Sequence, residues 1–475
     1  MHKKIHFLFL LALLNLAAFS QYKITVQSNY NAGLAYLTYH FGKNLNVQDS
    51  AMVNSKGQVV FQGSKSLPQG IYAIVFPGKR YSVDFLLSNQ QLIVIKTDTT
   101  KLLQTQITGS KDNDLFLAYQ KFVDAKGRQL MAERDAYLQS KNAADSALHE
   151  ANYMKLNREL NEYRETVVSS NPSSLMAALF NAMKEPPYPT KAPLTKQDTV
   201  DNYNFYKSHY WDGITFMDDR IIRTPFFLPK LERYYREIMH QSPDSLIKDI
   251  DYKLLLARNA PELNKFLLNW LTDEYINPKY MGQDAVFVHL FEKYHSKGLT
   301  PWLNEKQMET ITRRAYMQMA NLVGEKAANL EMLDTSGHSK PLYGMSADFT
   351  VVVFWDPNCG HCKEELPRID SIYRASWKEK GVKIYAVLAE KEEAKKDWLK
   401  YIHEQNITGW THVYQSKELA DAETASNRPG FRQLYDVIMT PTMYLLDKDK
   451  RIVGKKLTLL QMNDLMEVKR KTALK

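Results

Sequence analysis

The chain has 475 residues, of which 44% are hydrophobic and 24% are charged. That length exceeds one ordinary hydrophobic core, so we expect roughly two to four domains. The composition excludes a wholly disordered chain. Only two cysteines are present. This excludes a framework of disulfides as well as a zinc or iron–sulfur site built from four thiolates.

The formal net charge of +9 raises the question of a nucleic-acid partner. Two of these charges, Lys3 and Lys4, lie at the very start of the chain. The densest basic run, residues 469–471, is expected to close a C-terminal helix, where cations complement the helix dipole. No arginine-rich stripe alternates with aromatic residues, so we predict that the protein binds no nucleic acid.

Residues 1–20 are typical of a secretory signal peptide. Lys3 and Lys4 precede an apolar run over residues 5–14, and the small residues Ala18 and Ser20 precede the expected cleavage point. An uncleaved anchor is less favoured, because the run is shorter than the roughly 20 residues that span a bilayer. We therefore expect export to the periplasm or cell envelope of a Gram-negative bacterium, without stable insertion of the mature chain in the membrane.

Residues 21–110 have the pattern of an all-β domain. Short β-branched and aromatic runs alternate with turn residues. The expected strands cover residues 22–27, 34–40, 58–61, 71–76, 83–87 and 92–96. Their regular spacing predicts an antiparallel sandwich or barrel. No cluster of acids or histidines marks a site, so we interpret this domain as a binding or docking module.

Residues 111–326 change to the helical period of 3.6 and predict an all-α domain. The expected helices include residues 228–239, 242–259, 261–274, 284–297 and 304–322. Aromatic residues are dense at 203–211 and 226–235. They could line a ligand-binding box, but packing in the core is the commoner reason for such spacing.

Residues 327–475 contain both cysteines. The continuous apolar run at 349–355 predicts a central strand that is buried on both faces. A helical pattern starts at residue 363, so Cys359 lies between a buried strand and a helix. The free N–H groups and the dipole at a helix N-terminus stabilise a thiolate there. Cys362 is close enough in the chain to form a small disulfide ring with Cys359.

Two other roles for this pair are half of a zinc site and an inert disulfide. Zinc needs two further ligands, which no second pair of cysteines supplies. A disulfide between Cys359 and Cys362 closes so small a ring that it constrains the unfolded chain little. We therefore predict a redox-active dithiol that uses no metal and no cofactor.

In these features, residues 327–475 resemble the thioredoxin-like proteins, and among them the exported thiol–disulfide oxidoreductases of the TlpA and ResA type. Trp355 and the two cysteines fit the active-site motif, and Pro367 falls where the family kinks its active-site helix. Thr440 and Pro441 resemble the cis-proline loop that faces the disulfide, which implies a role in binding substrate. The resemblance implies an α/β thioredoxin fold for residues 327–475.

One position departs from thioredoxin itself. The buried acid of thioredoxin would fall at Val353, so that acid is absent. Glu365 instead matches a buried glutamate of the exported subfamily, which implies that it accepts the proton of Cys362. The other interpretation of Glu365 is a solvated charge beside Glu364.

The helical zone carries a second resemblance. Residues 210–225, which begin Tyr-Trp-Asp-Gly and end Arg-Thr-Pro, resemble an uncharacterised helical domain that precedes thioredoxin-like domains in bacterial envelope proteins. This resemblance implies a three-part architecture and carries no activity with it.

These observations predict a periplasmic thiol–disulfide oxidoreductase whose partners are client proteins with disulfides or thiols. Gly360 and His361 between the cysteines resemble protein disulfide isomerase, whereas the subfamily with Glu365 is usually reducing. A protonated His361 would also favour the thiolate. We favour a reductase or isomerase over a dedicated oxidase. A reductase in the oxidising periplasm requires an electron-transfer partner in the periplasm or membrane. The alternative is a cell-envelope binding or assembly protein with an accessory thioredoxin-like domain.

Overall fold

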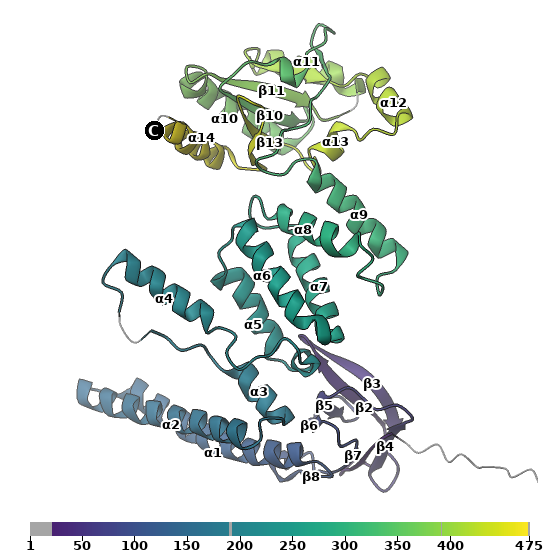
Figure 1. Cartoon of the computed structure of the whole chain (residues 1–475), viewed down its shortest axis with the longest axis vertical. Coiled ribbons are helices and arrows are strands. Elements are labelled where there is room, and N and C mark those ends of the chain that lie inside the picture. Colours follow the sequence, from purple (N-terminus) through teal and green to yellow (C-terminus); the bar gives the residue numbers. More distant parts are fainter. Residues whose placement is uncertain (1–20, 190–191, 391, 474–475) are drawn as a thin grey trace, which may run out of the picture. The chain divides into compact units, whose positions relative to one another are not determined.

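The computed structural model describes residues 21–189, 192–390 and 392–473 (Figure 1). The expected signal peptide lies outside the described residues. The chain divides into two compact units. One unit runs to Met239 and includes Leu256–Asn264, and the other comprises His240–Leu255 and Lys265–Lys475. Domain boundaries at residues 110 and 326 stay a prediction.

Two four-stranded sheets form the N-terminal β region. Their strand orders are β4-β1-β7-β8 and β3-β2-β5-β6. The strands are β1 (Tyr22–Gln27), β2 (Leu34–Phe41), β3 (Asn44–Met52), β4 (Gln58–Gly63), β5 (Gly70–Val75), β6 (Ser82–Leu87), β7 (Leu92–Lys96) and β8 (Gln106–Thr108). Side chains from both sheets meet in one buried cluster. Of the two predicted architectures, a sandwich or a barrel, the region is therefore a sandwich.

The sandwich differs from the prediction in two ways. Strand β1 pairs with β7 in parallel, so the sheets are not wholly antiparallel. Strands β3 and β8 were not predicted from the sequence. Strand β8 has three residues, too few to show a pattern. Strand β3 lies at the edge of its sheet, and most of its residues are exposed, so no alternation of apolar side chains marks it.

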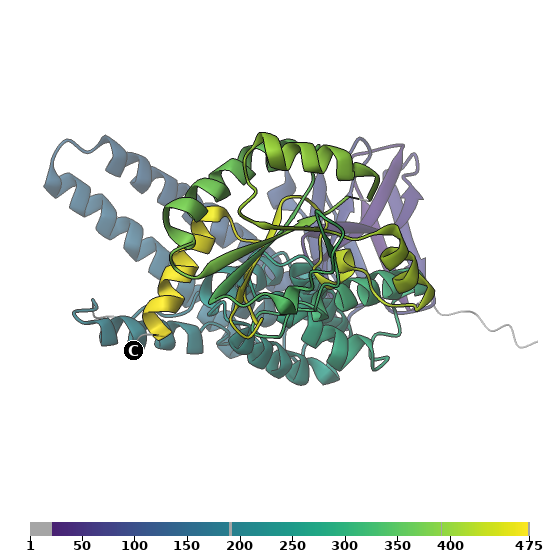
Figure 2. The ribbon, with the colours of Figure 1, turned by 90° about the horizontal axis from the view of Figure 1, so that it is seen from above.

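The central region is helical. Its helices are α1 (Lys111–Gln139), α2 (Ala143–Ser170), α3 (Leu175–Met183), α4 (Lys196–Ser208), α5 (Phe227–Arg233), α6 (Pro243–Leu256), α7 (Pro261–Tyr275), α8 (Asp284–Leu290) and α9 (Glu305–Met319). The two longest, α1 and α2, lie side by side as an antiparallel pair (Figures 1 and 2). The helices predicted at 228–239 and 284–297 end in π-helical turns, Tyr234–Ile238 and Phe291–His295.

The dense aromatic residues of this region pack against one another. Around the ring of Trp211, centroid distances are 5.0 to 6.2 Å to Tyr210, Phe216, Phe227 and Tyr234. Each of these four partners is at most 3% exposed. Core packing, which the sequence favoured, therefore accounts for these residues, whereas Tyr203 and Phe205 of the first aromatic run are 37% and 41% exposed.

A six-stranded mixed sheet forms the centre of the C-terminal region, in the order β14-β13-β10-β11-β12-β9. Its elements are β9 (Leu333–Asp334), β10 (Phe349–Trp355), α10 (Gly360–Ile372), β11 (Val382–Leu388), α11 (Lys395–Glu404), β12 (Thr411–Tyr414), α12 (Lys417–Ala425), α13 (Phe431–Leu434), β13 (Thr442–Asp447), β14 (Ile452–Lys455) and α14 (Leu459–Ala473). The predicted α/β fold class is confirmed.

Strand β10 lies in the middle of this sheet, parallel to β11 and antiparallel to β13. Val351, Val353 and Trp355 face one core, which α10, α11 and α14 cover. Val352 and Phe354 face a second core on the other side of the sheet. The continuous apolar run is therefore explained, because both faces of β10 are buried.

Within the part of the chain that the structure describes, no helix combines the length and apolar character needed to cross a bilayer.

Candidate functional site

The two cysteines lie where β10 ends and α10 begins. Cys359 is the N-cap residue of α10, with extended backbone, so the predicted position at a helix N-terminus is confirmed. Asp356 shapes the turn before it. Its carboxylate accepts from the N–H of Asn358 at 2.8 Å, and its carbonyl accepts from the N–H of Cys359 at 3.2 Å. The sulfur of Cys359 is thereby placed at the first turn of α10.

The two thiols differ in access. Both are free in the structure, and Cys359 is partly exposed. Cys362 is 1% exposed and belongs to the core beneath the sheet-facing side of α10. A disulfide of another molecule can therefore reach Cys359 and not Cys362.

A loop between α13 and β13 faces Cys359. The Thr440–Pro441 peptide bond is cis, as the resemblance implies. The thiol of Cys359 donates to the carbonyl oxygen of Thr440 at 3.3 Å. Thr442 closes the turn, because its hydroxyl donates to the carbonyl of Met439 at 2.6 Å. The fold thus brings the proline loop against the sulfur of Cys359, although the two segments are far apart in the chain.

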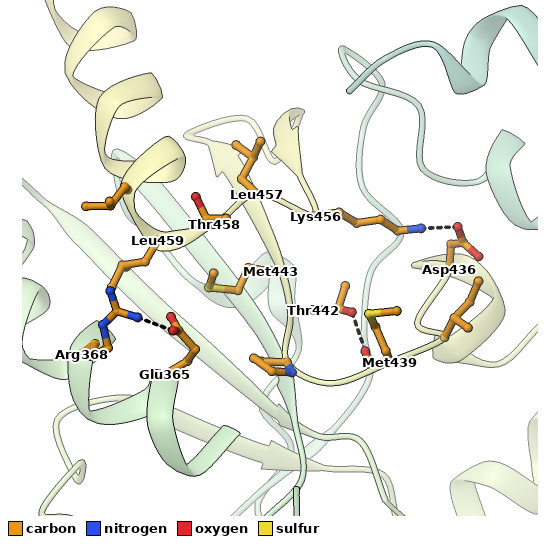
Figure 3. Close-up of a pocket in the computed structure, with 13 residues that line it drawn as sticks. Glu365, Arg368, Asp436, Met439, Thr442, Met443, Lys456, Leu457, Thr458 and Leu459 are labelled. Atoms are coloured by element: carbon orange, nitrogen blue, oxygen red, sulfur yellow. Dashed lines mark hydrogen bonds and ion pairs between the residues drawn. The ribbon is translucent and has the colours of Figure 1, made fainter. Parts of the chain in front are cut away.

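A cavity of about 550 Å³ opens beside this loop (Figure 3). Helix α10, the proline loop, β13 and the start of α14 supply its lining. Three apolar lining residues are strongly exposed, with exposed fractions of 64% for Ile438, 72% for Met439 and 65% for Leu460. An open apolar surface therefore lies next to the proline loop.

Glu365 lies on the α10 wall of the same cavity, and its carboxylate forms an ion pair with Arg368 (Figure 3). The Glu365 side chain is 28% exposed, so it is partly and not fully buried. Because it follows Cys362 by three positions on α10, both side chains lie on the same side of the helix.

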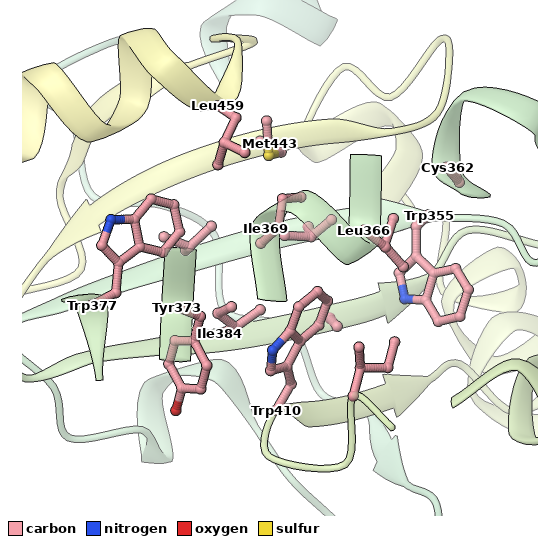
Figure 4. Close-up of a cluster of buried hydrophobic side chains, with 14 of the residues drawn as sticks. Trp355, Cys362, Leu366, Ile369, Tyr373, Trp377, Ile384, Trp410, Met443 and Leu459 are labelled. Carbon is pink, nitrogen blue, oxygen red and sulfur yellow. The ribbon is translucent and has the colours of Figure 1, made fainter. Parts of the chain in front are cut away.

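Trp355 supports the site from the core (Figure 4). Its side chain is fully buried at the end of β10, in the same cluster as Cys362 and Leu366. Its ring lies 5.3 Å from that of Tyr401. Trp355 therefore presents no exposed ring to a substrate, and it packs the floor of the site instead.

The remaining predicted residues lie on α10. The His361 side chain is 86% exposed, and its Nδ1 is 4.0 Å from the carboxylate of Glu364. Gly360 is exposed at the first position of the helix. Pro367 lies inside the helix and has no N–H for the carbonyl of Lys363. That carbonyl instead accepts from the hydroxyl of Tyr401 at 3.5 Å.

The two thiols also ionise differently. Partial burial opposes ionisation of Cys359, but contacts with Thr440 and with the N–H groups of Cys362 and His361 outweigh it, so the pKa of Cys359 is lowered. Burial raises the pKa of Cys362 to about 12. At neutral pH, the exposed cysteine is therefore the better nucleophile and the buried one holds its proton.

This difference predicts the pH dependence of alkylation. In a Cys362→Ser variant, Cys359 is the sole thiol of the chain. We expect its reaction with iodoacetamide to reach half its maximal rate below pH 8.5, about the pKa of an unperturbed thiol, because the thiolate is favoured in the folded protein. The same variant unfolded in urea is the control. A midpoint equal to or above that of the unfolded chain would contradict the assignment.

Sequence reasoning missed three residues beside the site, Asp436, Lys456 and Arg314. Asp436 is 2% exposed and forms ion pairs with both Arg314 and Lys456. No motif marks these residues, since they come from three separate segments of the chain.

Among the residues that the structure describes, no group of three or more histidine, cysteine, aspartate or glutamate side chains is placed to hold a metal ion.

Comparison with known proteins gives two family matches. Residues 323–455 match the AhpC/TSA family, and residues 22–116 match a domain of unknown function, DUF4369. The thiol–disulfide oxidoreductase ResA of Bacillus cereus is 28% identical over 133 residues, which cover 28% of this chain and 68% of that protein.

Two solved structures are also similar. A domain of a possible thiol–disulfide isomerase from Cytophaga hutchinsonii is 34% identical, and the match covers 32% of this chain and 97% of that one, with a TM-score of 0.28. A thioredoxin-like protein from Bacteroides caccae is 22% identical, and the match covers 60% of this chain and 97% of that one, with a TM-score of 0.45.

Proposed function

The C-terminal region is a thioredoxin-like domain of the AhpC/TSA family related to the ResA thiol–disulfide oxidoreductases, and from this we propose that the protein exchanges disulfides with client proteins through Cys359 and Cys362. The observation that carries the proposal is the difference between the two thiols in access and in pKa. One thiol is accessible with a lowered pKa, and the other is buried with a pKa of about 12.

The proposed reaction has two steps. The Cys359 thiolate attacks one sulfur of a client disulfide, forms a mixed disulfide and releases the other client sulfur as a thiolate. Cys362 then loses its proton and attacks the sulfur of Cys359, which releases the second client thiolate. The client gains two electrons, and the protein is left with a Cys359–Cys362 disulfide.

Other residues take supporting roles in this proposal. Glu365 accepts the proton of Cys362 in the second step, and Arg368 holds its carboxylate in place. The backbone N–H groups of His361 and Cys362, which follow Gly360, stabilise the Cys359 thiolate. Trp355 and Pro367 shape the floor of the site and the active-site helix.

The loop at Thr440 and Pro441 is proposed to bind the client chain. An extended client segment would pair with its backbone, as peptides do at exposed strand edges. Proline at this point supplies no N–H that could compete at the sulfurs.

We propose that the protein works as a reductase or isomerase in the periplasm, after export through the expected signal peptide. Turnover in the reducing direction leaves the Cys359–Cys362 disulfide, which has to be reduced again. An electron-transfer protein of the periplasm or membrane would supply those electrons. The β-sandwich and helical regions, with boundaries near residues 110 and 326, are proposed to select or position clients.

The experiment that tests the function is a Cys362→Ser variant expressed with its leader in a bacterial host. The first step remains while the second is blocked, so we expect mixed disulfides between Cys359 and client proteins. These adducts are detected on non-reducing gels and disappear with dithiothreitol. The control is the double variant without either thiol. Equal bands from the single and the double variant would contradict disulfide exchange.

A further inference from the structure

Asp436 is a buried carboxylate beside the redox site that the proposed reaction does not use. It lies two residues after the end of α13 and has a φ of 44° and an exposed fraction of 2%. One carboxylate oxygen accepts from Nη1 of Arg314 at 2.6 Å, and the other accepts from Nζ of Lys456 (Figure 3 shows the lysine contact). A carboxylate so far from water needs such partners, because desolvation is costly.

One of these partners comes from the helical region. Arg314 lies on α9, and its Nε also donates to the carbonyl of Ile276 at 3.1 Å. Asn321, just after α9, donates from Nδ2 to the carbonyl of Leu434 at 3.0 Å. Both contacts lie within one compact unit of the chain. The start of the proline loop is therefore held by side chains from outside the α/β fold.

The loop between this anchor and the reacting sulfur is short and open. Ile438 and Met439 are 64% and 72% exposed, so few contacts hold the middle of the segment. Its position depends on its two ends, Asp436 and the turn closed by Thr442. Thr440, which touches the sulfur of Cys359, lies between those ends.

We propose that Arg314 is a positioning residue for the redox site. Through Asp436, the helical region holds Thr440 against Cys359 and so sets the reactivity of that thiol. The inference rests on the proposed role of Cys359 as the attacking group. It gives the helical region a part in the chemistry, in addition to any part in choosing clients.

A change at Arg314 has a defined consequence for Cys359. Without the guanidinium, Asp436 loses its ion pair with Arg314 and keeps that with Lys456, so the loop start is free to shift. The thiol of Cys359 donates to the carbonyl of Thr440 at 3.3 Å, and the Thr440 side chain lowers the pKa of Cys359. Displacement of Thr440 from Cys359 removes both contacts and therefore shifts that pKa.

The test uses the full-length chain with Cys362→Ser, which leaves one thiol. The rate of alkylation by iodoacetamide is followed against pH in Arg314→Gln, with Arg313→Gln as the matched control. Arg313 is the neighbouring residue on α9 and is exposed. We expect the pKa of Cys359 to shift by about half a unit in Arg314→Gln, which corresponds to a roughly threefold change in the rate of alkylation at lower pH. Arg313→Gln leaves it unchanged.

A double-mutant cycle shows whether Arg314 acts through Asp436. In an Asp436→Asn background, Arg314→Gln is expected to add little further shift, because the two changes break one contact. A full additional shift there would overturn the inference, as would an unchanged pKa in a folded Arg314→Gln protein. Should that variant melt early, Arg314→Lys replaces it, with the same cycle and a smaller expected shift.

The readout separates this inference from the proposed function. Alkylation needs neither a client nor an electron donor. A wild-type protein that fails to exchange disulfides contradicts the proposed function, while the effect of Arg314 on Cys359 is measured all the same. If the wild-type protein reduces disulfides but the pKa of Cys359 does not change in Arg314→Gln, the inference alone is contradicted.

Discussion

Replacing Cys359 by serine is expected to slow disulfide reduction by about a thousandfold or more. The remaining thiol, Cys362, has a pKa of about 12, so only about one molecule in 100,000 carries its thiolate at pH 7. It is also 1% exposed, which keeps a protein disulfide away from its sulfur. Reduction of insulin with dithiothreitol as the electron donor measures the loss.

The matched control is Cys362→Ser. This variant keeps the accessible thiolate, so it is expected to form a mixed disulfide with insulin in a single turnover and then to stall. A Cys359→Ser protein with a tenth or more of the wild-type rate would show that Cys362 reaches the substrate, against the burial seen here.

Replacing Asp284 by alanine is expected to destabilise the second unit by about 3–5 kcal/mol. Lys455, on β14, is 7% exposed, and its ammonium group donates to the carboxylate of Asp284. It also donates to the backbone and side-chain oxygens of Asn321 at 2.8 and 2.7 Å. Loss of the carboxylate leaves a buried cation without its ion-pair partner, so much of the cost of desolvating it is no longer compensated.

Urea unfolding followed by tryptophan fluorescence measures this change in the free energy of unfolding. Asp464→Ala, at an exposed position of α14, is the control and is expected to change stability by no more than about 0.5 kcal/mol. A double change, Asp284→Leu with Lys455→Met, removes both charges and is expected to recover much of the loss. A small effect of Asp284→Ala alone would mean that water reaches Lys455.

Most strands and helices of the fold were predicted from local pattern. The run at 349–355 became β10, and the helical pattern that follows became α10, which begins earlier than predicted, at Gly360. Strand β3 was missed because its side chains are mostly exposed, and an edge strand of polar residues has no apolar period. The parallel pairing of β1 with β7 was missed because pairing partners are not encoded in the pattern of either strand.

By itself, the sequence determined that a pair of cysteines lies at the junction of a buried strand and a helix. Spacing within one segment was enough, because a strand end, a helix start and a pair of cysteines are all local features. Only the tertiary structure decided which thiol is open and which is buried, and that Thr440 lies 3.3 Å from Cys359 across 81 positions of the chain.

The same holds for the ion pair of Arg314 with Asp436, which joins residues 122 positions apart. Neither residue belongs to a motif, and each alone is an ordinary charged side chain. Their meeting depends on how α9 packs beside the end of α13, and packing of that kind is a sum of many contacts over the whole unit. The period of apolar residues along the chain indicates which face of a helix or strand is buried. It does not indicate which other helix or strand packs against that face.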